Sequence, residues 1–125
     1  MRVVDSCGWL EYLAGGTNAA FFEAVLVDEP ALLLPPLVIF EVTRRLRVLG
    51  QVQALDPVLT VMERLTLATL TSRQMAEAAH AAQVHRLAMA DAIIWHTAQV
   101  HGALLYTQDV DLKGLPGVVY QPKIL

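Results

Sequence analysis

The chain has 125 residues, a length that predicts one domain spanning residues 1–125, because it can bury one core and is too short for two. Its formal net charge is −3, with 9 Lys plus Arg against 12 Asp plus Glu, so it lacks the overall basic character of many nucleic-acid-binding proteins. Hydrophobic residues make up 55% of the chain, and the mean hydropathy is +0.47. This apolar excess over ordinary soluble domains predicts that part of the surface meets a partner.

The cysteine content and the longest apolar stretch indicate the cellular setting. Cys7 is the only cysteine, which excludes an internal disulfide, and no Cys or His pair has the spacing of a zinc site. Residues 31–40 are apolar but contain Pro35 and Pro36, and they fall short of the ~18 residues that a membrane span requires. Asp5 argues against a signal peptide at the N-terminus. We therefore expect a cytoplasmic protein without a membrane span.

The first half of the chain is predicted to form, in order, a strand, two helices, a strand and a helix: residues 2–5, 8–13, 18–27, 31–34 and 37–49. The first strand ends in the carboxylate of Asp5. Ser6 then has the side chain of a helix N-cap. Pro36 suits the first turn of the helix that follows it.

The second half is predicted to form, in order, a helix, a strand, two helices and two strands: residues 51–65, 66–69, 71–85, 91–101, 103–106 and 118–120. The helix over 51–65 is expected to be kinked or broken at Asp56-Pro57. An acidic loop, residues 107–111, follows the strand over 103–106. Strands that alternate with helices predict parallel pairing through right-handed crossovers, and therefore an α/β sandwich with four or five strands.

Glu41 is the most informative single residue, because it interrupts residues 37–42, whose other members suit a core. An isolated buried carboxylate is costly and is usually neutralised, paired or bound to a cation. Two interpretations stay open. Glu41 forms an ion pair with Arg44 or Arg45, worth only ~0.2–0.5 kcal/mol on an exposed helix face, or it is a metal ligand.

Three aspartates occupy positions that can converge with Glu41. Asp5 and Asp109 follow predicted strands, and Asp91 stands where a helix is expected to begin. Each has an ordinary alternative role in a turn or as a helix cap. In parallel α/β sheets, however, ligand sites form at the carboxyl ends of the strands, where all four acids can meet. Two unit charges ~4 Å apart cost about 4 kcal/mol at an effective dielectric of 20, so such a cluster needs cations, and oxygen ligands favour Mg²⁺ or Mn²⁺.

These motifs resemble the PIN-domain ribonucleases, especially the VapC-type toxins of bacterial toxin–antitoxin pairs. The resemblance covers essentially the whole chain and preserves the order of the family's motifs, which here read Val-Val-Asp5-Ser6 followed by Gly-Trp-Leu-Glu-Tyr-Leu, Glu41 in its apolar helix, Ala-Asp91-Ala-Ile-Ile, and Thr107-Gln-Asp109-Val-Asp111-Leu. It implies a PIN-like three-layer α/β/α sandwich with a central, mainly parallel sheet.

The resemblance also implies a set of functional residues and partners. The catalytic and metal-binding acids would be Asp5, Glu41, Asp91 and Asp109, with Ser6, Thr107 and Asp111 close to that site. The implied activity is that of a metal-dependent endoribonuclease, in which Mg²⁺ or Mn²⁺ activates the water that hydrolyses an RNA phosphodiester. The implied partners are an antitoxin protein that covers the acidic pocket and a second copy of the chain in a homodimer.

Several residues have a second interpretation besides a role in the implied site. Arg44 and Arg45 follow Glu41 by three and four residues, so they either bind the RNA backbone or are ordinary solvated cations. Asp111 either supports the metal site or caps a short loop helix. Cys7 is expected to be a small buried hydrophobe. Two alternative functions also stay open: a catalytically silent α/β module that binds a protein, and a PIN nuclease that processes RNA, or acts on DNA, and is not a toxin.

Overall fold

The structure, a computed structural model, describes residues 1–124, so Leu125, the last residue of the predicted domain, lies outside the described part. Its strands are β1 (Arg2–Val4), β2 (Leu33–Leu34), β3 (Thr66–Leu67), β4 (Leu104–Thr107) and β5 (Val118–Tyr120). Its α-helices are α1 (Ser6–Ala14), α2 (Ala19–Leu26), α3 (Pro36–Val48), α4 (Leu55–Glu63), α5 (Ser72–His85) and α6 (Met89–Val100). Three short 3₁₀ helices connect them: η1 (Glu29–Ala31), η2 (Val52–Ala54) and η3 (Val110–Leu112).

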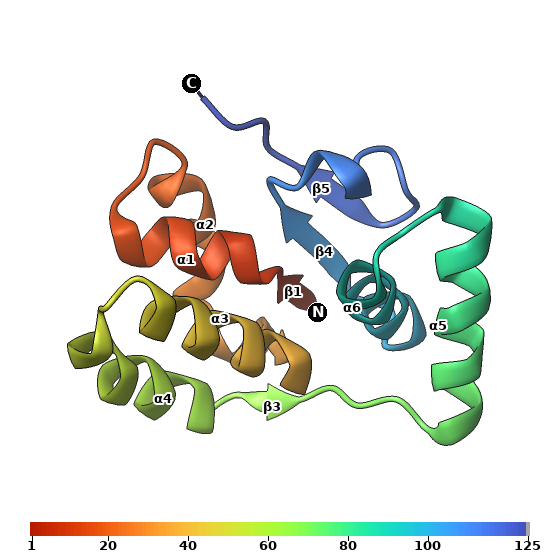
Figure 1. Cartoon of the computed structure of the whole chain (residues 1–125), viewed down its shortest axis with the longest axis horizontal. Helices are drawn as coiled ribbons and strands as arrows, with labels where there is room; N and C mark the ends of the chain where they lie inside the picture. The colour runs from red at the N-terminus through yellow and green to blue at the C-terminus, as the bar shows by residue number, and fades with distance from the viewer. Residues whose placement is uncertain (125) are drawn as a thin grey trace.

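All strand pairs in the described chain are parallel. β4 lies between β1 and β5, and β2 pairs with β3. A parallel bridge between Arg2 and Leu32 joins the two groups into the order β3-β2-β1-β4-β5. Figure 1 shows the strands between the group α1 to α4 and the pair α5 and α6. The predicted α/β fold with a parallel sheet of four or five strands is therefore confirmed.

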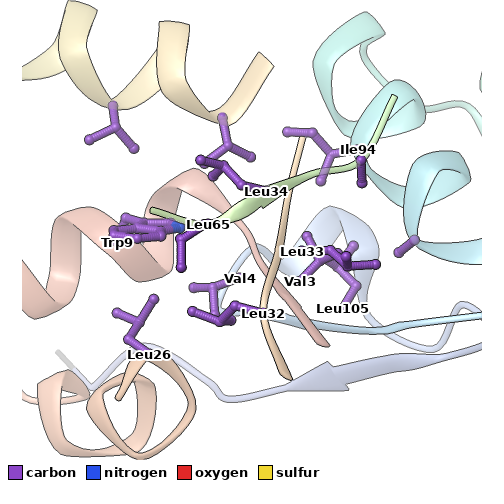
Figure 2. Packing of buried hydrophobic residues seen from close by; sticks show 14 of the residues in the cluster. Val3, Val4, Trp9, Leu26, Leu32, Leu33, Leu34, Leu65, Ile94 and Leu105 are labelled. Atoms are coloured by element: carbon purple, nitrogen blue, oxygen red, sulfur yellow. The ribbon is translucent and has the colours of Figure 1, made fainter. Parts of the chain in front are cut away.

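The hydrophobic core lies between the sheet and the helices. Figure 2 shows Trp9 of α1, Leu34 of β2 and Ile94 of α6 among the buried side chains that gather around the strands. These side chains are buried, as are Leu105 of β4, Val3 and Val4 of β1, and Leu33 of β2. Burial of apolar side chains on both faces is what confines the polar side chains near the strands to the strand ends.

Two predicted helix starts differ from the structure. The N-cap of α1 is Asp5, whose side chain accepts a hydrogen bond from the Ser6 backbone, and Ser6 is the first helical residue. Asp and Ser are about equally good caps, so the sequence did not decide between neighbours. The α6 helix begins at Met89, which places Asp91 in its first turn. An acid there is favoured by the partial positive charge of the helix N-terminus.

The segment from Gln51 to Thr69 differs most from the prediction. The helix predicted over residues 51–65, with a kink or break at Asp56-Pro57, is a 3₁₀ turn, η2, followed by α4, in which Pro57 is the third residue. Proline is tolerated there because the first backbone N–H groups of a helix have no intrahelical partner. The predicted strand shrinks to β3, whose residues Thr66 and Leu67 are exposed because β3 lies at the edge of the sheet.

No helix among residues 1–124 combines the length and the hydrophobicity that crossing a membrane requires.

Candidate metal centre

Asp5 stands where β1 ends and α1 begins, and its side chain is only 3% exposed. Three groups donate hydrogen bonds to its carboxylate. The Ser6 backbone N–H contacts Oδ1 at 2.8 Å, the Thr107 hydroxyl contacts Oδ2 at 2.9 Å, and the Cys7 thiol contacts Oδ2 at 3.5 Å. Burial raises the pKa of Asp5, these donors act in the opposite direction, and the charge of Asp109 raises it further. The carboxylate is therefore fixed in one orientation.

Thr107, the last residue of β4, connects Asp5 to the acidic loop. Its side chain is fully buried, and the hydroxyl that donates to Asp5 accepts a hydrogen bond from the Asp109 backbone at 2.9 Å. Asp109 then caps η3, because its Oδ1 accepts from the Asp111 backbone at 2.9 Å. One hydroxyl thus sets the positions of two acids that are distant in sequence.

Asp91 completes a cluster of three aspartates. One carboxylate oxygen each from Asp5, Asp91 and Asp109 lies within 4.8 Å of the other two. Burial is the main cause that raises the pKa of Asp91 to about 7, and the neighbouring charges of Asp109 and Asp5 add to the effect. The cluster stores electrostatic repulsion that protonation or a cation can relieve.

Glu41 approaches the aspartates from α3 but is not part of the group of three. Burial raises the pKa of Glu41, the charges of Asp5 and Asp109 act in the same direction, and the Ser6 hydroxyl lowers it. Its Oε1 atom is buried and has no hydrogen-bond partner. The ion pairs formed within residues 1–124 do not include Glu41, so the alternative of a salt bridge to Arg44 or Arg45 is not realised there.

The remaining predicted residues lie at different distances from this cluster. Ser6 contacts Asp5 through its backbone and acts on Glu41 through its hydroxyl. Asp111 is exposed and contributes a weak charge effect on Asp91, and the cap of η3 is Asp109, not Asp111. Arg44 is exposed, whereas Arg45 lines a groove together with Cys7.

Cys7 has a polar role that the sequence analysis did not predict. The residue is half-buried, and its Sγ lies 3.5 Å from Asp5 Oδ2 and 3.4 Å from Thr107 Oγ1. Burial raises the pKa of the Cys7 thiol to about 12, so the thiol keeps its proton at neutral pH. The available signal was position, since the residue two places after a strand-end acid lies in the first turn of the next helix and can face back toward that acid.

The donor set fits a hard divalent cation. The side chains that converge as possible metal ligands in the described chain are carboxylates, and such ligands select Mg²⁺ or Mn²⁺ over softer metals. The orphaned Oε1 of Glu41 and the raised pKa of Asp91 both reflect negative charge that is not balanced by a protein cation. A cation held by Asp5, Asp91 and Asp109, with Glu41 beside it, would balance this charge.

The fold and this cluster define a class: a parallel α/β protein that gathers carboxylates at the carboxyl ends of β1 and β4. The sequence places the chain more narrowly. The family model of the PIN domain matches residues 2–118, so this chain belongs to the PIN domain family. No curated protein gives a significant match to its sequence.

Solved structures show the same fold. The chain is similar to one in a toxin-antitoxin complex from Klebsiella pneumoniae, with a TM-score of 0.77 and 24% identity, over 99% of this chain and 100% of that chain. It is similar to PAE2754 from Pyrobaculum aerophilum, with a TM-score of 0.76 and 21% identity, over 95% of this chain and 87% of that one. A chain of VapBC2 from Rickettsia felis, bound to a DNA fragment from their promoter, gives a TM-score of 0.68 and 12% identity over 97% of each chain.

Proposed function

We propose that this PIN-domain protein is a metal-dependent endoribonuclease that acts as the toxin of a toxin–antitoxin pair. The observation that carries the catalytic part is the group of three aspartates, whose oxygens lie within 4.8 Å of one another, with the unpartnered Glu41 Oε1 beside it. Bound Mg²⁺ or Mn²⁺ would polarise a phosphate oxygen and lower the pKa of a water molecule. RNA as the substrate comes from the family resemblance.

The chain's own residues hold and orient this site. Asp5, Asp91, Asp109 and Glu41 supply the oxygens, and the Thr107 hydroxyl fixes Asp5 and the Asp109 loop relative to each other. The reaction needs no protein nucleophile. The one thiol nearby is protonated at neutral pH, since burial raises the pKa of Cys7 to about 12, and a thiol attacks only as the thiolate.

Cleavage of a mixed panel of single-stranded and structured RNAs tests the catalytic proposal. We expect the wild type to cut RNA in Mn²⁺ or Mg²⁺ and to stop in EDTA, and we expect Asp91→Asn to be inactive in every condition. Glu63→Gln is the matched control, because Glu63 is an exposed acid of α4 whose charge lies outside the cluster. If Asp91→Asn cleaves RNA as well as the wild type does, the metal-nuclease mechanism is refuted and the catalytically silent interaction module is favoured.

The toxin role is supported by two of the similar chains, one described as part of a toxin–antitoxin complex and the other as part of VapBC2. An antitoxin needs an apolar surface, and the chain has one. A groove of about 460 Å³ runs between α1, α2 and α4, lined by Trp9, Leu13, Val27 and Val58 among others. We expect expression of the wild type without a partner to arrest bacterial growth and Asp91→Asn to be harmless. Equal growth of the two strains would favour an RNA-processing nuclease.

A homodimer is proposed from a second apolar surface. Met75 of α5 and Met89 of α6 are 43% and 71% exposed beside a hollow of about 400 Å³ that Ala79 and Ile93 also line. Exposed apolar side chains at such a hollow suit a self-complementary interface. Light scattering at micromolar concentration should give a dimer that Met89→Glu converts to a monomer, and a monomeric wild type would exclude the proposed dimer.

A toxin that acts on cellular RNA is expected to work in the cytoplasm.

A further inference from the structure

Two adjoining hollows lie between the acidic cluster and α3. The first, of about 400 Å³, is lined by Asp109, Tyr120 and Pro122. The second, of about 280 Å³, extends to Arg45 of α3. The two hollows share Cys7, Gln108 and Lys123 as lining residues, so they adjoin, and the first of them reaches the cluster acid Asp109. Together we call them the Lys123 groove.

Cations border this groove although the chain as a whole is acidic. The chain has only two lysines, and both follow Asp109 in sequence. Lys123 lines both hollows, and Arg45 lines the second. The Lys113 ammonium lies over the Tyr120 ring, 5.6 Å from its centroid. None of these three cations takes part in an ion pair within the described residues. Lys123 and Arg45 are therefore available to phosphates, whereas Lys113 covers one face of the Tyr120 ring.

Tyr120 supplies an aromatic surface beside the acids. It is the register partner of Thr107 in the parallel pair of β4 and β5. Side chains of paired residues point to the same face of a sheet, so the Tyr120 ring lies on the face where Thr107 contacts Asp5. Bases of single-stranded nucleic acids stack on such rings with ~1–3 kcal/mol per base and little sequence preference.

A buried polar pair fixes the segment that carries Lys123. The Asn18 side chain, only 3% exposed, donates hydrogen bonds to Gln108 Oε1 at 3.1 Å and to the Pro122 carbonyl at 2.9 Å. Gln108 lies between Thr107 and Asp109, so Asn18 ties the residue before Lys123 to the loop of the metal centre. The cation is thereby placed at a defined position relative to the acids.

We propose that the Lys123 groove binds the single-stranded RNA segment next to the scissile phosphate, with Lys123 and Arg45 on its phosphates and Tyr120 stacked on a base. The proposal rests on the ribonuclease function proposed above and names residues that the acidic cluster does not include. Glu11 also lines the groove and opposes the phosphate charge. Charge changes at Lys123 and at Glu11 must therefore affect RNA binding in opposite directions.

RNA binding to inactive protein tests this proposal. The titrations use full-length Asp91→Asn, Mg²⁺ and a short fluorescent single-stranded RNA that the wild type cleaves, at several salt concentrations. Adding Lys123→Gln should weaken binding several-fold and reduce the salt slope by about 0.7, the value for one phosphate contact on a single strand. Glu11→Gln should tighten binding. Arg73→Gln is the control, because Arg73 is a cation that lines a different hollow between α5 and α6.

The aromatic contact is tested by two variants at one position. Tyr120→Ala should weaken RNA binding by about 5- to 150-fold, which corresponds to the loss of one stacked base. Tyr120→Phe should restore it, and both variants are melted to show that the fold is retained. If Tyr120→Ala does not fold, Lys123→Gln and Glu11→Gln decide the question.

The outcomes separate the two proposals. If the wild type cleaves RNA and the RNA affinity is unchanged in Lys123→Gln and Tyr120→Ala, the proposed role of the Lys123 groove is refuted. The proposed ribonuclease function is not affected by that result. Equal losses for Lys123→Gln and Arg73→Gln also refute the role of the groove, because they indicate unspecific attraction. If the wild type cleaves no RNA of the panel, both proposals fail. Binding of an acidic peptide in place of RNA would assign the groove to a protein partner and would overturn the RNA path.

Discussion

The Thr107 hydroxyl donates a hydrogen bond of 2.9 Å to Asp5 Oδ2, which joins the end of β4 to the end of β1. The same oxygen accepts from the Asp109 backbone, so neither acid can shift without breaking a buried contact. Parallel pairing brings the strand ends together, since Val4 is in register with Tyr106, and the hydroxyl then sets the spacing of the acids beyond them. One buried hydroxyl, which is not itself among the proposed metal ligands, therefore positions two acids of the cluster.

Thr107→Val should destabilise the protein by about 1–3 kcal/mol, because at constant side-chain size it removes the 2.9 Å donor to the buried Asp5 Oδ2 and the acceptor of the Asp109 backbone N–H. The remaining contact of Asp5 Oδ2 with the Cys7 thiol, at 3.5 Å, is longer. Thr107→Ser retains the hydroxyl and should lose less. Urea unfolding in EDTA measures both. The Mn²⁺-induced rise in melting temperature should also be smaller for Thr107→Val than for Thr107→Ser, and equal responses would show that the hydroxyl does not position the acids.

Metal binding should stabilise the wild type and not Asp91→Asn. A ligand that binds only the native state raises the free energy of unfolding by RT ln(1 + [L]/Kd), about 2.7 kcal/mol at a hundredfold excess over Kd. Thermal melts in EDTA and in millimolar Mn²⁺ give this difference, with Glu63→Gln as the control that keeps the full response. If neither Mn²⁺ nor Mg²⁺ changes the melting temperature of the wild type, the proposed mechanism has no basis.

The sequence pointed to the acids as a set, because each alone has an ordinary explanation as a turn residue, a helix cap or an ion-pair partner, whereas all four can meet at one edge of the sheet. Glu41 interrupts an apolar helix face, and the structure leaves its Oε1 buried without a hydrogen-bond partner. Asp5 and Asp109 follow strands whose parallel pairing predicts a shared edge. The spacing of the acids could not be predicted from the sequence, because it depends on the Thr107 hydroxyl and on where α6 begins, two residues before Asp91.

The positions of Tyr120 and Lys123 and the exposure of β3 could not be predicted from the sequence. Tyr120 and Lys123 come near the acids only through the register of β5 with β4 and through the contact of Asn18 with the Pro122 carbonyl. Thr66 and Leu67 have the composition of a strand, and whether a strand is buried or lies at an edge depends on the order of strands in the sheet. Pairings between distant segments therefore account for most of what the sequence pattern did not predict.

Gly8→Ala should destabilise the junction of α1 with β1. A Cβ at this position would lie 2.6 Å from both the Phe22 ring and Val4 Cγ1, and neither buried side chain has space to retreat. Overpacking of this kind costs about 1–3 kcal/mol. Gly50→Ala is the comparison, because its Cβ meets open space and only the positive φ of 72° is strained. Urea midpoints should fall more for Gly8→Ala, and an unchanged midpoint would show that α1 can move away from the strand.

The stability of the metal-free protein should fall as the pH rises toward neutrality. The folded-state pKa of Asp91 is raised from 3.8 to about 7, so the folded protein binds this proton more tightly than the unfolded chain does. The resulting stability is present below the unfolded pKa and is lost between about pH 4 and pH 7. Because the side chain is only about half buried, solvent screening limits the loss to roughly 1–2 kcal/mol. Urea unfolding in EDTA at pH 5 and pH 8 should show a smaller pH effect in Asp91→Asn than in the wild type. Parallel curves for the two proteins would mean that Asp91 titrates normally and that the aspartates do not repel one another in the folded state.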